Sequence, residues 1–406
     1  MKKTKPIALL LGLALLLCGC EAAPTQASEI QQSQPIEPAP EPEPEPFTAT
    51  LAVCGDIMSH MPQTRDAWSD TLGAYDYTTM LSGARTYVQN ADFAVANLET
   101  TFAGGPDYSG YPAFNTPDEL ADGLQDLGFD LLLTANNHCM DRRYDGLART
   151  LDVLDARGLA HVGTYRTQEE RDANHGIVLA DVGGISVAFL GYTYGTNGIP
   201  LESGREYSVN LFNTDYLSSC STPNTEQLAA DLAAAQALSP DLIAVMIHWG
   251  VEYQTTQNAY QEQIAQFLFD NGADIILGGH SHVLQPMQLR TLADGRQGFV
   301  CFSLGNMISA QNDRYTDTTV ALTLELTKDP ATGAAWVSGY SYAPLLMLDR
   351  ESGADVRFEL LDVYQTLSSG QADETLTAKL EQAIADCHTI LGETGDIGAW
   401  TATPAA

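Results

Sequence analysis

Short apolar runs that end in metal-binding types of side chain constrain this sequence more than any other feature. Runs of this length that are apolar throughout are typical of strands buried on both faces of a sheet. Aspartate, glutamate, asparagine and histidine, which follow them, are residue types that bind metal ions. The five runs are residues 48–54, before Asp56; 93–96, before Glu99; 130–135, before Asn137 and His138; 242–247, before His248; and 274–277, before His280 and His282.

Helical patterns lie between most of these runs, so the sequence predicts an α/β fold. Asn224 and Asn258 stand where N-caps belong, and residues 177–190 have the pattern of a hairpin. A sixth strand is expected at residues 299–303. The expected helices cover residues 80–90, 117–127, 145–157, 225–238 and 258–271.

The polar clusters are expected to meet, although they are spread over most of the chain. In open α/β sheets, ligands bind outside the carboxyl ends of the strands. One such cluster is explained equally well as a turn or a helix cap. Five clusters at the ends of five strands favour a common site at one edge.

The residue types at these ends suit a pair of divalent metal ions. A carboxylate bridges two ions, and an asparagine oxygen completes a shell without adding charge. His280 and His282 are two residues apart in an extended segment, so their rings point the same way and each could serve one ion. Bound ions would polarise a phosphoryl or carbonyl oxygen and acidify a water. His138 directly follows Asn137, so it points elsewhere, which suits an acid beside the metals.

The order of the motifs resembles the calcineurin-like metallophosphoesterase superfamily, and more closely its bacterial capsule-synthesis branch, the CapA (poly-gamma-glutamate) family. The resemblance covers roughly residues 48–345. It implies a four-layer αββα sandwich. The motifs that carry it are Gly55-Asp56, Asn97-Leu98-Glu99, Asn136-Asn137-His138, His248-Trp249-Gly250, Gly279-His280-Ser281-His282 and Ser303-Leu304-Gly305-Asn306.

The resemblance also implies the distribution of ligands between two divalent ions, which would be Mn, Fe or Zn. Asp56 and His282 would hold one ion. Asn137, His248 and His280 would hold the other.

The remaining roles implied by the resemblance include one departure. Glu99 would bridge the ions, and His138 would be the catalytic acid. The wider superfamily has a metal-binding histidine two residues after the first aspartate, where this chain has Met58. His60 either compensates from four residues after Asp56 or is a surface loop histidine.

Three residues after His138 extend the predicted site. Asp141 either orients His138 in catalysis or caps the following helix. Arg142 and Arg143 are conspicuous in a chain with few cations. They either bind an anionic substrate group, as His60 could, or are solvated loop charges. Trp249 and Tyr253 are expected to pack in the core rather than to contact substrate.

The N-terminal residues predict an exported lipoprotein. A basic start is followed by an apolar stretch at residues 7–17 that is too short for a stable membrane span. The sequence Leu-Cys-Gly-Cys that ends at Cys20 resembles a lipobox, so Cys20 is the expected lipid attachment site. The expected location is extracytoplasmic, with the lipid in the cell membrane.

Four segments follow from these patterns: a signal peptide at residues 1–19, a disordered Pro/Glu-rich linker at 20–46, the phosphoesterase-like domain at 47–350, and a C-terminal extension at 351–406. The extension contains an amphipathic helical pattern at residues 372–391.

The net charge of −33 makes nucleic acid an unsuitable partner, because the phosphate backbone would be repelled.

The favoured function is capsule or poly-gamma-glutamate synthesis with a dinuclear-metal hydrolytic site, and the expected partner is a cell-surface polymer or its synthase complex. Two alternatives stay open: a phosphoesterase for another envelope or nucleotide substrate, and a non-catalytic accessory that binds polymer or synthase.

Overall fold

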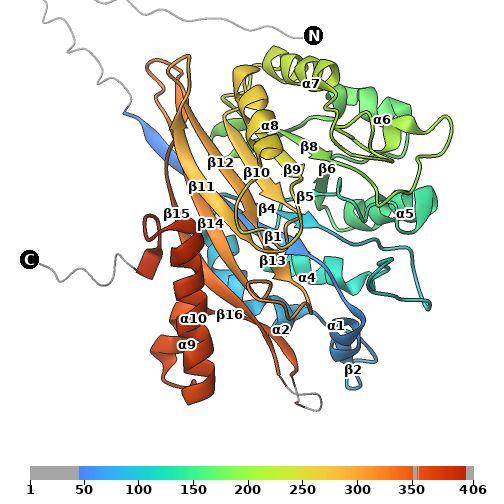
Figure 1. The fold of residues 1–406 in the computed structure, drawn as a ribbon, viewed down its shortest axis with the longest axis vertical. Coiled ribbons are helices and arrows are strands. Elements are labelled where there is room, and N and C mark those ends of the chain that lie inside the picture. Colours follow the sequence, from blue (N-terminus) through green and yellow to red (C-terminus); the bar gives the residue numbers. More distant parts are fainter. Residues whose placement is uncertain (1–44, 351–353, 355, 399–406) are drawn as a thin grey trace, which may run out of the picture. The chain divides into compact units, whose positions relative to one another are not determined.

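Two β-sheets packed face to face, with helices on both outer sides, form the four-layer αββα sandwich that was expected (Figure 1). The computed structural model describes residues 45–350, 354 and 356–398. The predicted signal peptide, Cys20 and nearly all of the linker lie outside the described residues. Within the part of the chain that the structure describes, every helix is too short or too polar to span a membrane.

The first sheet runs in the order β16-β15-β14-β1-β4-β5-β6, and β13 also pairs with β1. The pairs β1–β4, β4–β5 and β5–β6 are parallel. The strands are β1 (Phe47–Ile57), β4 (Phe93–Leu98), β5 (Leu131–Leu133), β6 (Ala160–Val162), β13 (Asn306–Ile308), β14 (Thr318–Lys328), β15 (Ala335–Asp349) and β16 (Phe358–Asp362).

The second sheet runs in the order β11-β12-β10-β9-β8-β7. Its centre, from β12 to β8, is parallel, and the predicted hairpin forms the β7–β8 edge. A short pair, β2 (Trp68–Ser69) and β3 (Ala74–Tyr75), lies apart. The six strands are β7 (Val178–Val182), β8 (Ile185–Thr193), β9 (Leu242–His248), β10 (Ile275–Gly279), β11 (Leu284–Thr291) and β12 (Gln297–Leu304).

Both faces of the central strands are buried, which explains why their sequences are apolar throughout. In β9, Ala244 and Met246 point into the core between the sheets, whereas Val245 and Ile247 pack under helices. Successive side chains in a strand point to opposite faces, so a strand with covering on both sides needs an unbroken apolar run.

The helices divide between the two outer faces. The first sheet is covered by α2 (Thr78–Leu81), α3 (Arg85–Asn90), α4 (Glu119–Leu127) and α5 (Arg143–Asp155). The second is covered by α7 (Thr225–Ala237) and α8 (Ala259–Asp270). The predicted N-caps are confirmed: the side chain of Asn224 accepts a hydrogen bond from the backbone N–H of Gln227, and that of Asn258 from Gln261. Two further short helices are α1 (Met61–Asp66) and α6 (Gln168–Asp172).

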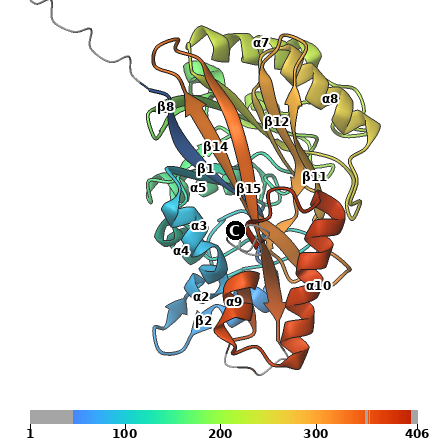
Figure 2. The same cartoon turned by 90° about the vertical axis from the view of Figure 1, so that its left-hand side faces the viewer.

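The C-terminal segment packs onto the first sheet. β16 extends the sheet beyond β15, and α9 (Val363–Ser369) follows it. The predicted terminal helix is present as α10 (Glu374–Leu391), which lies along β15 (Figure 2). Its Leu380 and Ala383 pack with residues of β15 and β16. These contacts anchor the helix away from the edge that carries the ligand-type residues.

Candidate metal centre

The ends of β1 and β10 approach each other across the two sheets. Parallel pairing sets Asp56 opposite Asn97 in one sheet and His248 opposite Gly279 in the other. The backbone N–H of His280 donates to Oδ2 of Asp56 at 2.9 Å. A Cβ at Gly279 would lie 2.4 Å from Oδ1 of Asp56, so only glycine permits this approach. The glycine before His280 therefore lets the two sheets share one site.

Two groups of buried ligand-type side chains lie at this edge. We name them the histidine group (Glu99, His248 and His280) and the aspartate group (Asp56, Glu99 and His282). Within each group the candidate ligand atoms all lie within 4.8 Å of one another. Glu99 belongs to both, which is the arrangement that a bridging carboxylate requires.

Asn137 lies beside the histidine group. Its Oδ1 is 2.8 Å from Nε2 of His248, so it is a further oxygen donor there. The ring of Tyr194 packs against the same side, with its centroid 4.6 Å from that of His280. The structure thus brings together Asn137 with the five other residues that were predicted as metal ligands.

Two buried polar atoms of this cluster receive no hydrogen bond from the part of the protein that the structure describes. Oε1 of Glu99 and Nδ1 of His280 are buried without a hydrogen-bond partner among the described residues. Burial raises the pKa of Asp56 to about 7 and that of Glu99 to about 8. Burial also lowers the pKa of His248 to about 4.

A divalent cation would satisfy these atoms. Buried polar groups without a hydrogen bond lower the stability of the folded protein. A bound cation accepts electron pairs from the oxygen and nitrogen atoms of carboxylates, imidazoles and amides alike. The donor set fits Mn, Fe or Zn. The residues in place therefore fit the metal ions that the resemblance implies.

His138 lies beside the cluster and belongs to neither ligand group. Its Nδ1 is 2.7 Å from Oδ2 of Asp141, and its ring meets that of Phe114 edge-on at a centroid distance of 4.8 Å. Burial opposes protonation, but the Asp141 contact and the nearby Glu99 carboxylate outweigh it and raise the pKa of His138. Asp141 also accepts from the backbone N–H of Phe114 at 2.7 Å. Of its two predicted roles, orienting His138 is the one with a contact; the N-cap of α5 is Arg142.

Sequence reasoning missed two asparagines that support the ligands. Nδ2 of Asn97 donates to Oδ1 of Asp56 at 2.7 Å and lies 3.2 Å from Nδ1 of His248. Oδ1 of Asn306 lies 3.1 Å from Nδ1 of His282. Both asparagines stand in the motifs that carry the resemblance, and that position was the available signal.

His60 and the position of Met58 do not complete the aspartate group. Met58 is buried. His60 is the N-cap of α1, where its ring packs on Phe114 and its Nδ1 accepts from the backbone N–H of Ala310 at 3.3 Å. His60 belongs to neither ligand group, and its contacts hold the wall behind His138 rather than supplying a donor in place of Met58.

The two arginines predicted to bind an anionic group lie in different surroundings. Arg142 is half-buried and its guanidinium donates to Oγ of Ser109, so it fixes the neighbouring loop. Arg143 is exposed at the first residue of α5. Tyr253 was expected in the core, but its side chain is exposed, and its ring centroid lies 5.8 Å from that of His282.

Comparison with known protein families identifies the family of this chain. Residues 50–311 match the family of the bacterial capsule synthesis protein PGA_cap. This chain belongs to the PGA_cap family. The family resemblance read from the motifs is thereby confirmed.

Two named relatives share this part of the chain. The PGA biosynthesis protein CapA of Bacillus subtilis (strain 168) is 32% identical over 189 residues, 46% of this chain and 44% of that protein. The capsule biosynthesis protein CapA of Bacillus anthracis is 27% identical over 295 residues, 70% of this chain and 65% of that protein. The chain thus spans between about half and two thirds of the length of these relatives.

Two solved structures are similar to this chain. The calcineurin-like phosphoesterase YfkN from Bacillus subtilis has 16% identity and a TM-score of 0.39, with 83% of this chain and 99% of that chain covered. A phosphatase from Mycoplasma pneumoniae has 12% identity and a TM-score of 0.41, with 74% and 94% covered.

Proposed function

We propose that this PGA_cap family protein acts in the synthesis of a capsule or a poly-gamma-glutamate-like surface polymer through a metal-dependent phosphoesterase-like site. One observation carries the proposal: the histidine and aspartate groups share Glu99, and His138, next to Asn137 in the chain, is near enough to Glu99 for that carboxylate to raise its pKa. A purely structural cluster would not require a buried carboxylate oxygen without a hydrogen bond at its centre.

Each residue has a role in this proposal. Asp56, Glu99 and His282 would hold one divalent ion, and Asn137, His248 and His280 with Glu99 would hold the other. Such ions, when bound, polarise a phosphoryl oxygen and lower the pKa of a water.

The protein supplies the acid. Asp141 engages Nδ1 of His138, which fixes the ring and leaves Nε2 as the nitrogen that meets substrate. A protonated His138 would donate its Nε2 proton to the leaving oxygen. The raised pKa of His138 supports this role, because it increases the protonated fraction near neutral pH.

The polymer and its synthase complex are the proposed partners. The names of the two CapA relatives support a capsule or poly-gamma-glutamate setting. With a net charge of −33, this chain would repel a polyanion at long range. Any anionic polymer would therefore be captured locally, by the metal ions or by Arg143 on the exposed start of α5.

A second candidate function is a non-catalytic accessory that keeps the metal centre for structure. The observation that favours it is Met58, which leaves the aspartate group without the extra histidine that the superfamily uses. A phosphoesterase for another envelope or nucleotide substrate is the other alternative, and a substrate screen separates the two.

The deciding experiment compares His138→Asn with His248→Asn in purified protein. His138→Asn should keep its metal, measured by elemental analysis, and lose about 10²- to 10⁴-fold in phosphoester turnover. His248→Asn should lose metal as well as activity. Equal metal loss in both would make His138 a ligand and contradict the proposed acid. A wild type that binds metal but hydrolyses neither phosphoesters nor polyglutamate would favour the accessory function.

We also propose that the protein is an extracytoplasmic lipoprotein anchored through Cys20. The basic start, the apolar residues 7–17 and the lipobox-like sequence support this. In cells, the wild type should fractionate with membranes and incorporate labelled fatty acid, whereas Cys20→Ser should do neither. Identical fractionation of the two would refute the anchor.

A further inference from the structure

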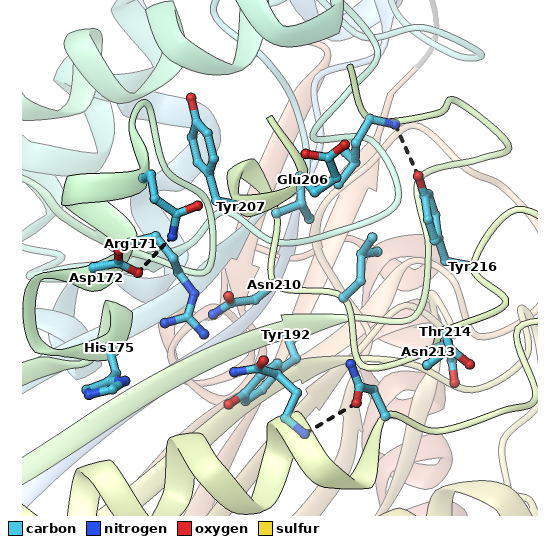
Figure 3. A pocket seen from close by; sticks show the side chains of 16 residues that line it. Arg171, Asp172, His175, Tyr192, Glu206, Tyr207, Asn210, Asn213, Thr214 and Tyr216 are labelled. Carbon is cyan, nitrogen blue, oxygen red and sulfur yellow. Dashed lines mark hydrogen bonds between the residues drawn. The ribbon is translucent and has the colours of Figure 1, made fainter. Parts of the chain in front are cut away.

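A polar cavity that no residue of the ligand groups lines lies on the side of the second sheet. It has a volume of about 520 Å³ and is formed by α6, the end of β8 and the connection between β8 and α7 (Figure 3). Its lining residues and the two ligand groups are separate sets. Cavities of this size bind small molecules in other proteins.

A buried carboxylate fixes one wall of this cavity. Asp231 is 1% exposed, and its oxygens accept hydrogen bonds from Arg171 at 2.9 Å, from the hydroxyl of Tyr192 at 3.0 Å and from Nε2 of Gln227 at 2.8 Å. All three partners line the cavity. Their orientation is therefore set by the protein before any ligand arrives, which lowers the entropy cost of binding.

Several polar atoms of the lining remain available to a ligand. Arg171 uses Nη2 for Asp231, and its Nε and Nη1 have no hydrogen-bond partner among the described residues. Asn210 donates from Nδ2 to the Tyr165 hydroxyl and to a backbone oxygen, which leaves its Oδ1 as an acceptor. Figure 3 shows Arg171 reaching from α6 toward Tyr192, with Tyr216 on the opposite side.

The charge of the lining argues against an anionic ligand. The positive charge of Arg171 is balanced by Asp231 at 2.9 Å. Asp172 and Glu206 add two exposed carboxylates to the rim. The lining therefore carries no excess of positive charge, and the chain as a whole is strongly negative.

The lining also offers apolar and aromatic surface. Tyr207 and Tyr216 are partly exposed, and Leu201 and Val209 lie between the polar groups. Alternating hydrogen-bonding atoms and apolar ring faces match a molecule whose edges carry hydroxyls and whose faces carry C–H bonds. Fixed polar groups then give orientation, and ring contacts give affinity.

We propose that this cavity is a binding site for a neutral, hydroxyl-rich ligand, a short saccharide. The cavity shares no residue with the two ligand groups, but a short series of contacts links it to the histidine group. Nδ2 of Asn213, a lining residue, donates to the backbone oxygen of Tyr194 at 3.1 Å, and the ring of Tyr194 packs on His280. A saccharide in the cavity would thus lie behind the segment that backs the histidine group.

The test uses glucose, N-acetylglucosamine and cellobiose as neutral probes, and γ-linked triglutamate as the anionic comparison. Saturation-transfer NMR and calorimetry on the purified protein should show millimolar binding of at least one neutral probe and none of triglutamate at this site. Tyr216→Ala should weaken that binding about tenfold, as loss of a buried aromatic contact does. The adjacent Leu217→Ala is the matched control, because Leu217 is exposed and outside the lining.

A second variant guards against misfolding of Tyr216→Ala. His175 lines the cavity with φ at +54°, so His175→Gly removes the ring and relieves the backbone. It should weaken binding about threefold, since a rim contact contributes less than a central one. His280→Ala should bind the saccharide as the wild type does. Absence of binding by all three neutral probes, equal loss in Leu217→Ala, or loss in His280→Ala would overturn the proposal.

Discussion

The histidine group and the aspartate group share Glu99 but differ in the donors around them. Beside the histidine group, Asn137 places its Oδ1 2.8 Å from His248. Beside the aspartate group, the corresponding addition is lost to Met58, and Asn306 contacts His282 rather than adding a new ligand. Four candidate ligand residues on the side of the histidine group, against three in the aspartate group, predict that the two sites differ in metal affinity. The histidine group should bind its ion more tightly.

The two groups also differ in chemical character. The histidine group has two imidazoles and one carboxylate, whereas the aspartate group has two carboxylates and one imidazole. Imidazole suits zinc and iron, and carboxylate suits harder ions such as manganese. If both groups bind metal, the shared Glu99 would serve two sites of different preference, which could hold different ions.

The largest expected effect comes from Glu99→Gln, because both groups depend on this residue. Elemental analysis should find most of both ions lost. The metal-free variant should melt at or above the temperature of the metal-free wild type, because a buried carboxyl with a raised pKa is replaced by a neutral isostere. Retention of one full ion would show that the groups do not share Glu99.

The next effect separates the two groups. His280→Ala should remove the tighter ion, and His282→Ala should remove the weaker one, so that metal titration of each variant shows one remaining class of site. His161 contacts the exposed carboxylate of Asp155 and lies outside both groups. His161→Ala is therefore the control and should bind metal as the wild type does. If His280→Ala and His282→Ala lose the same ion, the division into two groups is wrong.

The sequence predicted the residues of the two ligand groups better than it predicted the strands that surround them. The strands β1, β4, β9 and β10 are buried on both faces over most of their length. Their apolar runs, and the polar residues that end these runs, could therefore be recognised in the sequence. Asp56 and His280 lie 224 residues apart yet touch, because strand ends that point the same way meet at one edge.

The long antiparallel strands β14 and β15 were not identified as strands. Each has one face in the core and the other partly exposed, so polar residues such as Glu325 and Ser338 interrupt the apolar pattern. The hydrogen bonds that support the ligand-type residues were not predicted from the sequence either. The motif Asn97-Leu98-Glu99 marked the position of Asn97, but its contact with Asp56 follows from the parallel register of β1 and β4.

A smaller effect is expected from Asn306→Ala, which touches the aspartate group alone. Loss of the Oδ1 contact to Nδ1 of His282 frees the ring, and loss of such an outer partner typically costs about 10- to 100-fold in metal affinity. Asn306→Asp keeps an acceptor for the ring and should retain affinity. Calorimetric titration should show the weaker site changed and the tighter site untouched; weakening of both would mean that Asn306 acts through the fold.

The smallest expected effect is a gain, from Met58→His. If the superfamily position is equivalent here, the new imidazole adds a donor to the aspartate group and brings it to the number around the histidine group. The affinity of the weaker site should rise several-fold. The metal-free protein should lose about 1–3 kcal/mol of stability, because a polar ring replaces a buried apolar side chain without a partner.

The matched control for this gain is Met58→Leu, which keeps burial and adds no donor. It should leave both affinities unchanged. Calorimetric titration of the three proteins, with melting temperatures with and without metal, separates added coordination from altered packing. A histidine at position 58 that destabilises the metal-free protein and gives nothing back on metal addition would show that this position faces away from Asp56. The inequality of the two groups would then belong to the geometry of the β1 end rather than to one missing ligand.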